Sequence, residues 1–372
     1  MKLRVEPSKA SNLALAGHWL IGISLLLAGC GAESGIHSEP GGSEEDIASQ
    51  SQNLVQFNPL TLINGWVNSP FNTATAGYAN VNGTVQLRGG ISGGTNNTAF
   101  VLPVFNRPSA VVYVQNDLWL GNVGRLRIDP SGSVFLIDEA GGLANSGQFT
   151  SLENVSFGIS VGPFVNVALM NGWTNAPFST RNVGVRNDAG TIRLIGAMAG
   201  GTTGDAFFLP DGFRPPTEVY VPVGLCNGIK GRLHIQPSGL VTVIAENGAF
   251  PQAQCFTSVE GVTFAASSSG YTSVALQNGW QNAPFSTRNV LFRNDNGILR
   301  FQGAVASGSA SLLFTLPVGS RPAKNIFVNV DLCDAHKGRI TVDPSGLVTV
   351  QAATSFSHAQ CFTSLEGASF AL

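Results

Sequence analysis

Charged residues are scarce in this chain of 372 residues. Asp, Glu, Lys and Arg make up 11 % of it, against about a quarter in ordinary globular domains. The formal net charge is only −2, so the chain lacks the basic surface that nucleic-acid binding requires, and nucleic acid is not an expected partner. Histidine is equally scarce, with five residues, which leaves few groups for general acid–base chemistry.

Long apolar runs are also missing, except within the first thirty residues. There a positively charged head precedes an apolar run over 20–27, which is the layout of an export signal. The run ends in Leu27-Ala28-Gly29-Cys30. This ending resembles the lipobox of bacterial lipoproteins, in which cleavage precedes the Cys and its thiol is acylated.

The lipobox resemblance implies a signal peptide over 1–29, lipidation of Cys30, and export of a chain held to a bacterial membrane by its lipid. Gly31 follows the Cys where inner-membrane lipoproteins commonly carry Asp, which favours the outer membrane or cell surface. The alternative is an ordinary signal peptide or a short membrane anchor with a chance Cys. The uninterrupted run is, however, shorter than the ~20 residues of a spanning helix.

The next segment, 30–57, has the composition of a flexible tether. It is rich in Gly, Ser, Ala and acidic residues and poor in apolar ones. Such a segment cannot bury enough apolar surface to offset its ordering entropy, so we expect it to be disordered.

The rest of the chain is one domain present in three copies. Asn64-Gly65-Trp66 returns as Asn171-Gly172-Trp173 and as Asn278-Gly279-Trp280, at an interval of 107 residues each time. A period near 100 fits a self-sufficient domain better than a solenoid unit. We therefore expect domains over 58–157, 166–264 and 273–372, joined by short connections.

Within each copy the apolar pattern has period two, and Gly and Pro number 45 and 19. This combination predicts an all-β fold: three tandem antiparallel β-sandwiches, jelly-roll-like, without a convincing helix. In the second copy the strands are expected over 167–170, 183–186, 191–196, 206–209, 218–221, 231–236, 240–245 and 256–264.

Cysteines occur in pairs in two of the three copies. Cys226 and Cys255 in the second copy match Cys333 and Cys361 in the third, whereas the first copy has Trp119 and Gln148 instead. Because both positions change together, we expect disulfides Cys226–Cys255 and Cys333–Cys361, which an exported chain permits. Four-cysteine metal binding is the alternative, but the close ligand pairs of zinc sites are missing.

No catalytic group recurs with the repeat. None of the three histidines after residue 57 has an equivalent in another copy, so no Ser-His-Asp or Cys-His arrangement belongs to the repeated unit. One acid does recur, and a glycosidase needs a second beside it. We expect no enzyme, and a structural role for the recurrent acid as a partner of Arg125, Arg232 and Arg339 or as a turn cap. The recurrent acids are Glu153, Glu260 and Glu366.

No cofactor or metal site is expected either. Asp295-Asn296-Gly297 suggests calcium, but its oxygens are too few, and the same turn in the second copy contains Ala189. A hairpin turn is the better interpretation.

The recurrent tryptophans are the candidate ligand contacts. Trp66, Trp173 and Trp280 could stack on sugars, although a Trp repeated at one place is more often a core residue. Polar contacts to a sugar would come from loops that differ between copies, at 92–98, 199–205 and 307–311.

A longer series of motifs carries a second resemblance. Leu-x-Asn-Gly-Trp is followed by Pro-Phe, by Phe314-Thr315-Leu316-Pro317, by Gly338-Arg339-Ile340 and by Ser364-Leu365-Glu366-Gly367. The series resembles C-terminal domains of bacteriophage tail and tail-fibre proteins. The resemblance implies β-rich tips that recognise a host surface, often as trimers, with no catalytic residue to carry over.

Two functions follow as hypotheses. The first is a lipid-anchored cell-surface or outer-membrane protein that binds glycans, because low charge with many Asn, Ser and Thr residues suits recognition of hydroxyl groups. The second is a structural envelope lipoprotein that engages protein partners and no small ligand. For assembly, an intramolecular pseudo-trimer, a string of separate domains and a homo-oligomer all agree with the sequence.

Overall fold

The computed structural model describes residues 54–139, 141–160 and 162–372. The predicted signal peptide, Cys30 and the tether up to residue 53 lie outside the described residues. Residues 54–57 were also assigned to the tether from the sequence, but they contact the folded body. The Val55 amide donates to the Asn296 carbonyl at 2.8 Å, and the Arg88 guanidinium lies 4.6 Å from the centre of the Phe57 ring.

Each copy of the repeat consists of a four-stranded antiparallel sheet and a second, larger antiparallel sheet. In the second copy the two sheets have the strand orders β12-β14-β15-β22 and β13-β16-β21-β18-β19-β20-β17. Their strands are β12 (Val165–Asn166), β14 (Gly184–Asp188), β15 (Thr191–Ile195), β22 (Thr263–Ala265), β13 (Thr174–Asn175), β16 (Ala197–Ala199), β21 (Thr257–Ser258), β18 (Val219–Leu225), β19 (Lys230–Ile235), β20 (Leu240–Ala245) and β17 (Asp205–Phe208).

The third copy repeats this topology strand for strand, with orders β23-β25-β26-β33 and β24-β27-β32-β29-β30-β31-β28. Its strands are β23 (Thr272–Ser273), β25 (Leu291–Asp295), β26 (Ile298–Gln302), β33 (Ser369–Ala371), β24 (Gln281–Asn282), β27 (Ala304–Ala306), β32 (Thr363–Ser364), β29 (Ile326–Leu332), β30 (Lys337–Val342), β31 (Leu347–Ala352) and β28 (Leu312–Thr315).

The first copy has the same strands, but its larger sheet is divided into β10-β5-β2 and β6-β9-β8-β7, beside the four-stranded sheet β1-β3-β4-β11. An isolated bridge between Leu118 and Thr150 connects the two pieces. The strands are β1 (Asn58–Pro59), β3 (Gly77–Val81), β4 (Thr84–Arg88), β11 (Ser156–Gly158), β10 (Thr150–Ser151), β5 (Gly90–Ser92), β2 (Val67–Asn68), β6 (Thr98–Val101), β9 (Ser133–Asp138), β8 (Val123–Ile128) and β7 (Val112–Asp117).

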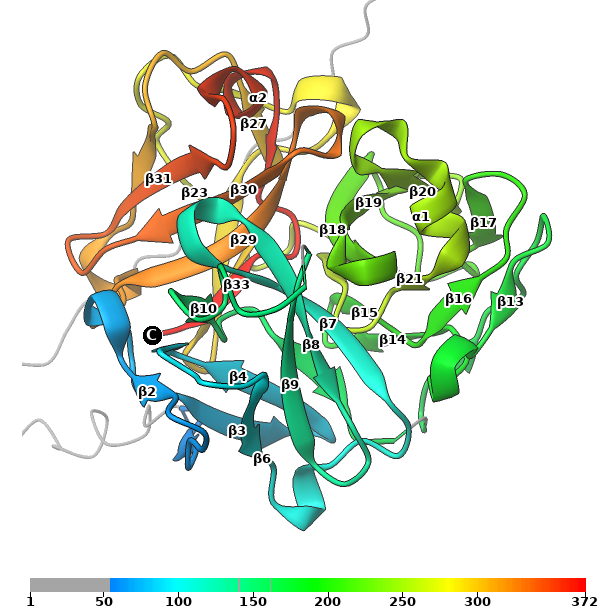
Figure 1. Ribbon diagram of the computed structural model, residues 1–372. Coiled ribbons are helices and arrows are strands. Elements are labelled where there is room, and N and C mark those ends of the chain that lie inside the picture. The colour runs from blue at the N-terminus through cyan, green and yellow to red at the C-terminus, as the bar shows by residue number, and fades with distance from the viewer. Residues whose placement is uncertain (1–53, 140, 161) are drawn as a thin grey trace, which may run out of the picture. The chain divides into compact units, whose positions relative to one another are not determined.

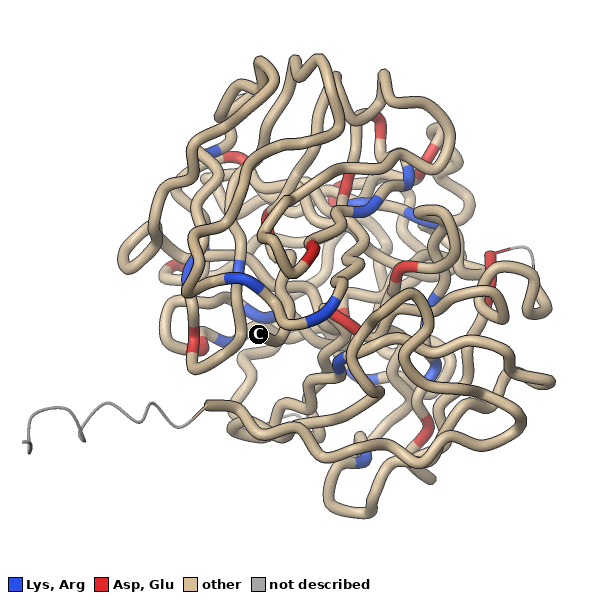
Figure 2. Tube along the Cα trace, turned by 90° about the vertical axis from the view of Figure 1, so that its left-hand side faces the viewer, with Lys and Arg blue, Asp and Glu red and all other residues tan. Residues whose placement is uncertain are grey.

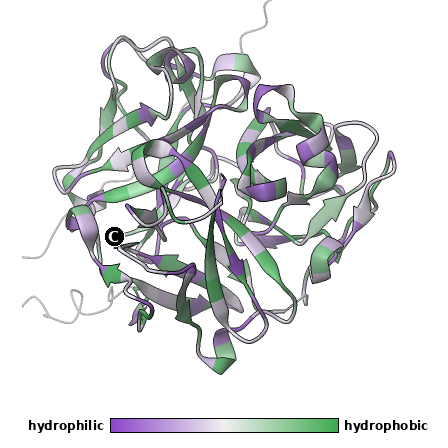
Figure 3. Ribbon diagram, viewed as in Figure 1, coloured by the Kyte–Doolittle hydropathy of each residue, from purple (hydrophilic) through white to green (hydrophobic). Residues whose placement is uncertain are grey.

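The predicted all-β sandwich fold is confirmed. Buried and less buried positions alternate along long strands such as β9 and β20, and the residue hydropathy that colours the ribbon in Figure 3 varies along the strands. Each copy buries its own apolar core, with Phe100, Phe207 and Phe314 fully buried at the same place in the three copies. Among the described residues, no helix is long and apolar enough to cross a membrane.

Several expected elements differ from the observed ones. The strand predicted over 256–264 is two short strands separated by a turn, and the one over 167–170 is reduced to a single bridge at Leu169. Two six-residue helices, α1 (Phe250–Cys255) and α2 (Phe356–Cys361), were not expected. A helix of six residues is too short to show a helical stripe in the sequence.

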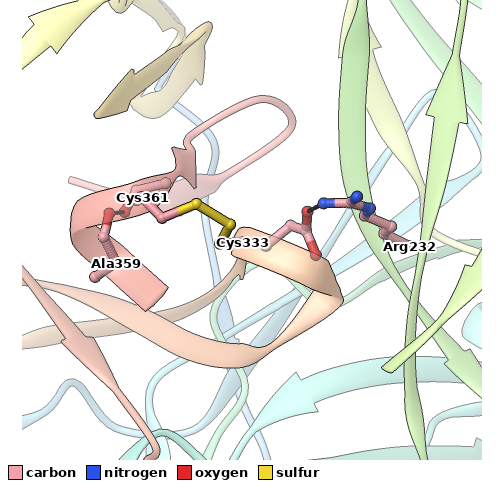
Figure 4. The surroundings of a disulfide bond; sticks show 6 residues. Arg232, Cys333, Ala359 and Cys361 are labelled. Carbon is pink, nitrogen blue, oxygen red and sulfur yellow. Dashed lines mark hydrogen bonds and ion pairs between the residues drawn. A yellow bond between two sulfur atoms is a disulfide. The ribbon is translucent and has the colours of Figure 1, made fainter. Parts of the chain in front are cut away.

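The two predicted disulfides are present. Cys226 bonds to Cys255 and Cys333 to Cys361, with a Cα–Cα distance of 5.7 Å in both. Each disulfide joins the short helix, α1 or α2, to the turn that precedes β19 or β30. Figure 4 shows this bond in the third copy. In the first copy Trp119 stands in this turn and its ring lies 5.1 Å from that of Phe71. The first copy thus has an aromatic contact at this turn where the other copies have a cysteine.

The three copies contact one another in a closed ring. Ser258 of the second copy donates to the Tyr113 carbonyl of the first at 2.5 Å. Ser364 of the third copy donates to the Tyr220 carbonyl of the second at 2.6 Å, and Ser151 of the first to the Phe327 carbonyl of the third at 2.6 Å. The strands β7, β18 and β29 lie against each other at the centre of this ring (Figure 1).

Candidate binding grooves at the repeat junctions

The recurrent tryptophans lie in the cores and do not offer a ring face to a ligand. Trp66, Trp173 and Trp280 are each 5 % exposed. Their indole N–H groups donate to main-chain carbonyls 30 residues further on, at 2.8–2.9 Å. The candidate loops 92–98, 199–205 and 307–311 fold over these rings, each through a glycine whose position leaves no room for a side chain. The sugar-stacking interpretation of these residues therefore does not fit the structure.

The recurrent acid is a buried turn cap that also joins neighbouring copies. Glu260 accepts from the Gly196 amide of its own copy at 2.9 Å and from the Gly158 amide of the preceding copy at 3.2 Å. Glu366 repeats both bonds, to Gly303 and Ala265. Glu153 closes the ring with bonds to Gly89 and to Ala371 of the third copy.

The prediction that these acids pair with Arg125, Arg232 and Arg339 is wrong. Glu260 pairs with Arg181, and Glu366 lies 3.5 Å from the equivalent Arg288. The first copy has Ala74 at this position, so Glu153 lacks the arginine that pairs with Glu260 and Glu366 in the other copies. Burial raises the pKa of Glu153 to about 7, against the weaker opposing effects of two main-chain amides and of the Arg88 charge.

Arg125, Arg232 and Arg339 cross the junctions instead. Arg232 pairs with Asp331 of the third copy at 3.3 Å, as Figure 4 shows beside the disulfide. Arg339 pairs with Asp117 of the first copy at 3.3 Å, and Arg125 donates to the Leu225 carbonyl at 3.0 Å. Each guanidinium also lies over an aromatic ring of its own copy, at 4.6, 5.0 and 4.7 Å from Tyr113, Tyr220 and Phe327.

An exposed phenylalanine lies next to each of these arginine–aromatic pairs. Phe71, Phe178 and Phe285 expose 49, 62 and 60 % of their surface. Each packs edge-on against a buried phenylalanine of the same copy, at ring distances of 5.6–5.7 Å. That buried ring in turn contacts the aromatic residue of the preceding copy at 5.0–5.2 Å. The buried rings are Phe149, Phe256 and Phe362.

The backbone at these exposed phenylalanines is left-handed. Their φ angles are 55°, 55° and 52°, a conformation that costs a bulky residue about 1–2 kcal/mol and suits Gly or Asn. The residue after each of these phenylalanines accepts a hydrogen bond, through its carbonyl, from a main-chain amide of the preceding copy. For example, the Glu218 amide donates to the Ser286 carbonyl at 3.2 Å. These hydrogen bonds explain the backbone conformation but do not require an aromatic side chain there. A half-exposed ring at a strained position is the kind of outlier found at binding sites.

The junction between the second and third copies forms a defined groove of about 110 Å³. It is lined by Tyr220 and Arg232 on one side and by Phe285, Phe362, Cys333 and Asp334 on the other. Asp334 is exposed, and burial combined with nearby carboxylates raises the pKa of Tyr220, so its hydroxyl keeps its proton. The groove thus combines aromatic rings with a cation, an acid and a hydroxyl donor.

The turn residue equivalent to Asp334 differs between the three junctions. It is Leu120 at the junction of the third and first copies, Asn227 at that of the first and second, and Asp334 at that of the second and third, each with a left-handed backbone. The recurrent aromatic residues therefore adjoin an apolar, an amide and an acidic turn residue, and at the junction of the third and first copies the Trp119 ring also packs on Phe71. The sequence signal that could have identified these grooves is the recurrent Pro-Phe pair.

The described histidines lie at two places in the fold. The rings of His336 and His358 stack at 3.6 Å; burial and the neighbouring imidazole lower the pKa of His358. His234 bonds to Glu218 at 2.6 Å and stacks on Tyr220. Within the described ranges, no group of three or more His, Cys, Asp or Glu residues could hold a metal ion. Asp295, which suggested calcium, is paired with Arg293 and Arg300.

Comparison of the chain with protein-family models, with curated proteins and with solved structures finds no match.

Proposed function

We propose that this protein is held to the bacterial surface by lipid at Cys30 and binds glycans in the three junction grooves. The observation that supports the proposal most is the same half-exposed, left-handed phenylalanine beside an arginine and a second aromatic ring at every junction. An aromatic ring can cover the C–H face of a sugar, while guanidinium, amide and carboxylate groups bond its hydroxyls.

Three grooves in one ring would act together on a repeating polysaccharide. Each groove is small, so its affinity for a single sugar is expected to be low. Binding at one groove raises the effective concentration of the same polymer at the next, which increases affinity without new contacts. The sparse charge of the body, visible in Figure 2, suits a neutral hydroxyl-rich ligand.

The alternative, a structural lipoprotein that engages a protein partner, also has a supporting observation. Val104 and Phe105 of the first copy are 66 and 87 % exposed. The second copy has Asp211 and Gly212 at the same positions. Two adjacent exposed apolar side chains on one copy suit contact with another protein better than contact with a sugar.

Replacing Phe71, Phe178 and Phe285 together with Asn tests the grooves. Asn tolerates the left-handed backbone, so relief of strain offsets the lost ring packing and stability should change by no more than about 1–2 kcal/mol. Loss of the anchoring ring is expected to weaken glycan binding at least tenfold. The full chain in mild detergent is applied to a glycan array, and the hits are quantified for both proteins.

Phe105→Asn is the matched control, because it removes an exposed ring outside the grooves and should leave glycan binding unchanged. A signal that is equal in the triple variant and the parent contradicts the groove assignment. No signal on any glycan, together with a protein partner that Phe105→Asn releases, would favour the structural alternative.

A further inference from the structure

A polar cavity of about 470 Å³ lies where the hairpins of the three four-stranded sheets meet. The lining comes from all three copies, with Gln86 from the first, Arg193 from the second and Arg300 from the third at equivalent positions. Val55, near the start of the described chain, also lines it. No junction groove residue takes part, so this cavity is a separate site.

The charges around the cavity do not balance. In the second copy Arg186 and Arg193 share the single carboxylate of Asp188. In the third copy Arg293 and Arg300 share Asp295 in the same way. The first copy contributes no charge at the three equivalent positions, which hold Ala79, Val81 and Gln86. The cluster therefore carries two positive charges in excess.

The excess charge lies on partly or fully buried guanidinium groups with unused donors. The Arg193 side chain is 3 % exposed. Its Nε and Nη1 donate to Asp188 and to Ser156 of the first copy, at 3.3 and 2.7 Å. Of the Arg300 nitrogens, only Nε has a hydrogen-bond partner among the described residues, at 2.9 Å from Asp295.

The positive charge of Arg300 also disfavours the charged form of Arg193. The pKa of Arg193 falls to about 10, chiefly through burial and next through the positive charge of Arg300. A negatively charged group between them would remove this repulsion and occupy the remaining donors.

We propose that this cavity binds a doubly charged oxyanion, of the phosphate or sulfate type, between Arg193 and Arg300. Guanidinium groups match such oxygens with pairs of hydrogen bonds, and the two excess charges match the charge of the anion. The anion can be free in solution or, if Cys30 is lipidated as proposed above, part of a lipid headgroup, since Val55 on the Cys30 side of the described chain lines the same cavity.

The proposal is tested by calorimetric titration of the full chain in mild detergent, first with inorganic phosphate and then with sulfate. Titration with chloride at equal ionic strength is the control. Arg300→Gln and Arg193→Gln each install the residue that the first copy already has, Gln86. We expect saturable binding to the parent protein and at least tenfold weaker binding to each variant. Arg214→Gln, which alters a largely exposed arginine elsewhere, should bind like the parent.

Absence of saturable binding to the parent protein at millimolar phosphate and sulfate overturns the proposal, without any need for the variants. Binding of equal strength in the parent and in folded Arg300→Gln overturns it as well. Flotation of the Cys30→Ser chain, which cannot be acylated, with phosphatidylcholine vesicles that contain phosphatidic acid then distinguishes the sources. Arg300-dependent flotation identifies a headgroup ligand; binding of inorganic anion without flotation identifies a free one. The glycan result does not bear on either outcome.

Discussion

Replacing Asp331 with glycine is expected to lower the free energy of unfolding by about 3–5 kcal/mol. Asp331 is fully buried at the junction of the second and third copies, where it pairs with the equally buried Lys230. Removing the carboxylate takes this counter-charge away from the buried Lys230 ammonium group and from Arg232, which also pairs with Asp331. Burial already lowers the pKa of Lys230 against the effect of Asp331, so part of the loss will appear as deprotonation of the lysine.

The chain contains its own apolar version of this junction. Between the first and second copies, Val123 and Gly224 occupy the positions of Lys230 and Asp331. The double substitution Lys230→Val with Asp331→Gly should therefore recover most of the stability that either single change removes. Urea unfolding of the parent, both single variants and the double variant gives the coupling energy. Additive losses in the double variant would contradict the assignment of the pair.

Raising the pH from 5 to 8 is expected to remove roughly 2–3 kcal/mol of stability through Glu153 alone. The pKa of this carboxyl is raised from 4.5 to about 7 by burial. Between these two values the unfolded chain loses the proton while the folded chain keeps it. The stabilisation is thus complete below pH 4.5 and is lost as the pH rises to about 7. Burial also raises the pKa of Asp117 to about 7, against the charge of Arg339, and it should contribute in the same direction.

Two substitutions isolate the contribution of Glu153. Glu153→Gln should reduce the pH dependence by about the stated amount, because an amide stays neutral throughout. Ala74→Arg installs the arginine that Arg181 and Arg288 provide in the other copies, and should lower the pKa of Glu153 and stabilise the protein at pH 8. Urea unfolding at pH 5 and pH 8 measures both. An unchanged pH dependence in Glu153→Gln would assign the effect to other groups.

The sandwich fold could be predicted from the apolar pattern within one copy, and the disulfides from a comparison of the three copies. Alternating apolar residues identify strands such as 240–245, and the joint loss of two cysteines identifies a bond such as Cys226–Cys255. The helix α1 could not be predicted, since six residues show no period.

The site could not be predicted in the same way because its residues come from different copies. Glu260 recurs visibly, but the Gly158 amide that it binds lies 102 residues away in the preceding copy. The exposed phenylalanines adjoin the Trp motif in sequence. Their place at a junction becomes visible only in the structure. There Tyr113 or Tyr220 of the preceding copy packs against the buried phenylalanine that the exposed one also contacts. Recurrence in the sequence made Trp173 a candidate ligand contact. Its ring is buried in the core and offers no face to a ligand.

The account predicts one glycan-binding site at each of the three junctions, and native mass spectrometry measures this most directly. The parent chain is mixed with the shortest oligosaccharide that the glycan array identifies, and bound copies per chain are counted. We predict up to three, with one fewer for each of Phe71→Asn, Phe178→Asn and Phe285→Asn that is introduced. A count that stays the same after all three substitutions, or a parent chain that binds no oligosaccharide, would contradict the account.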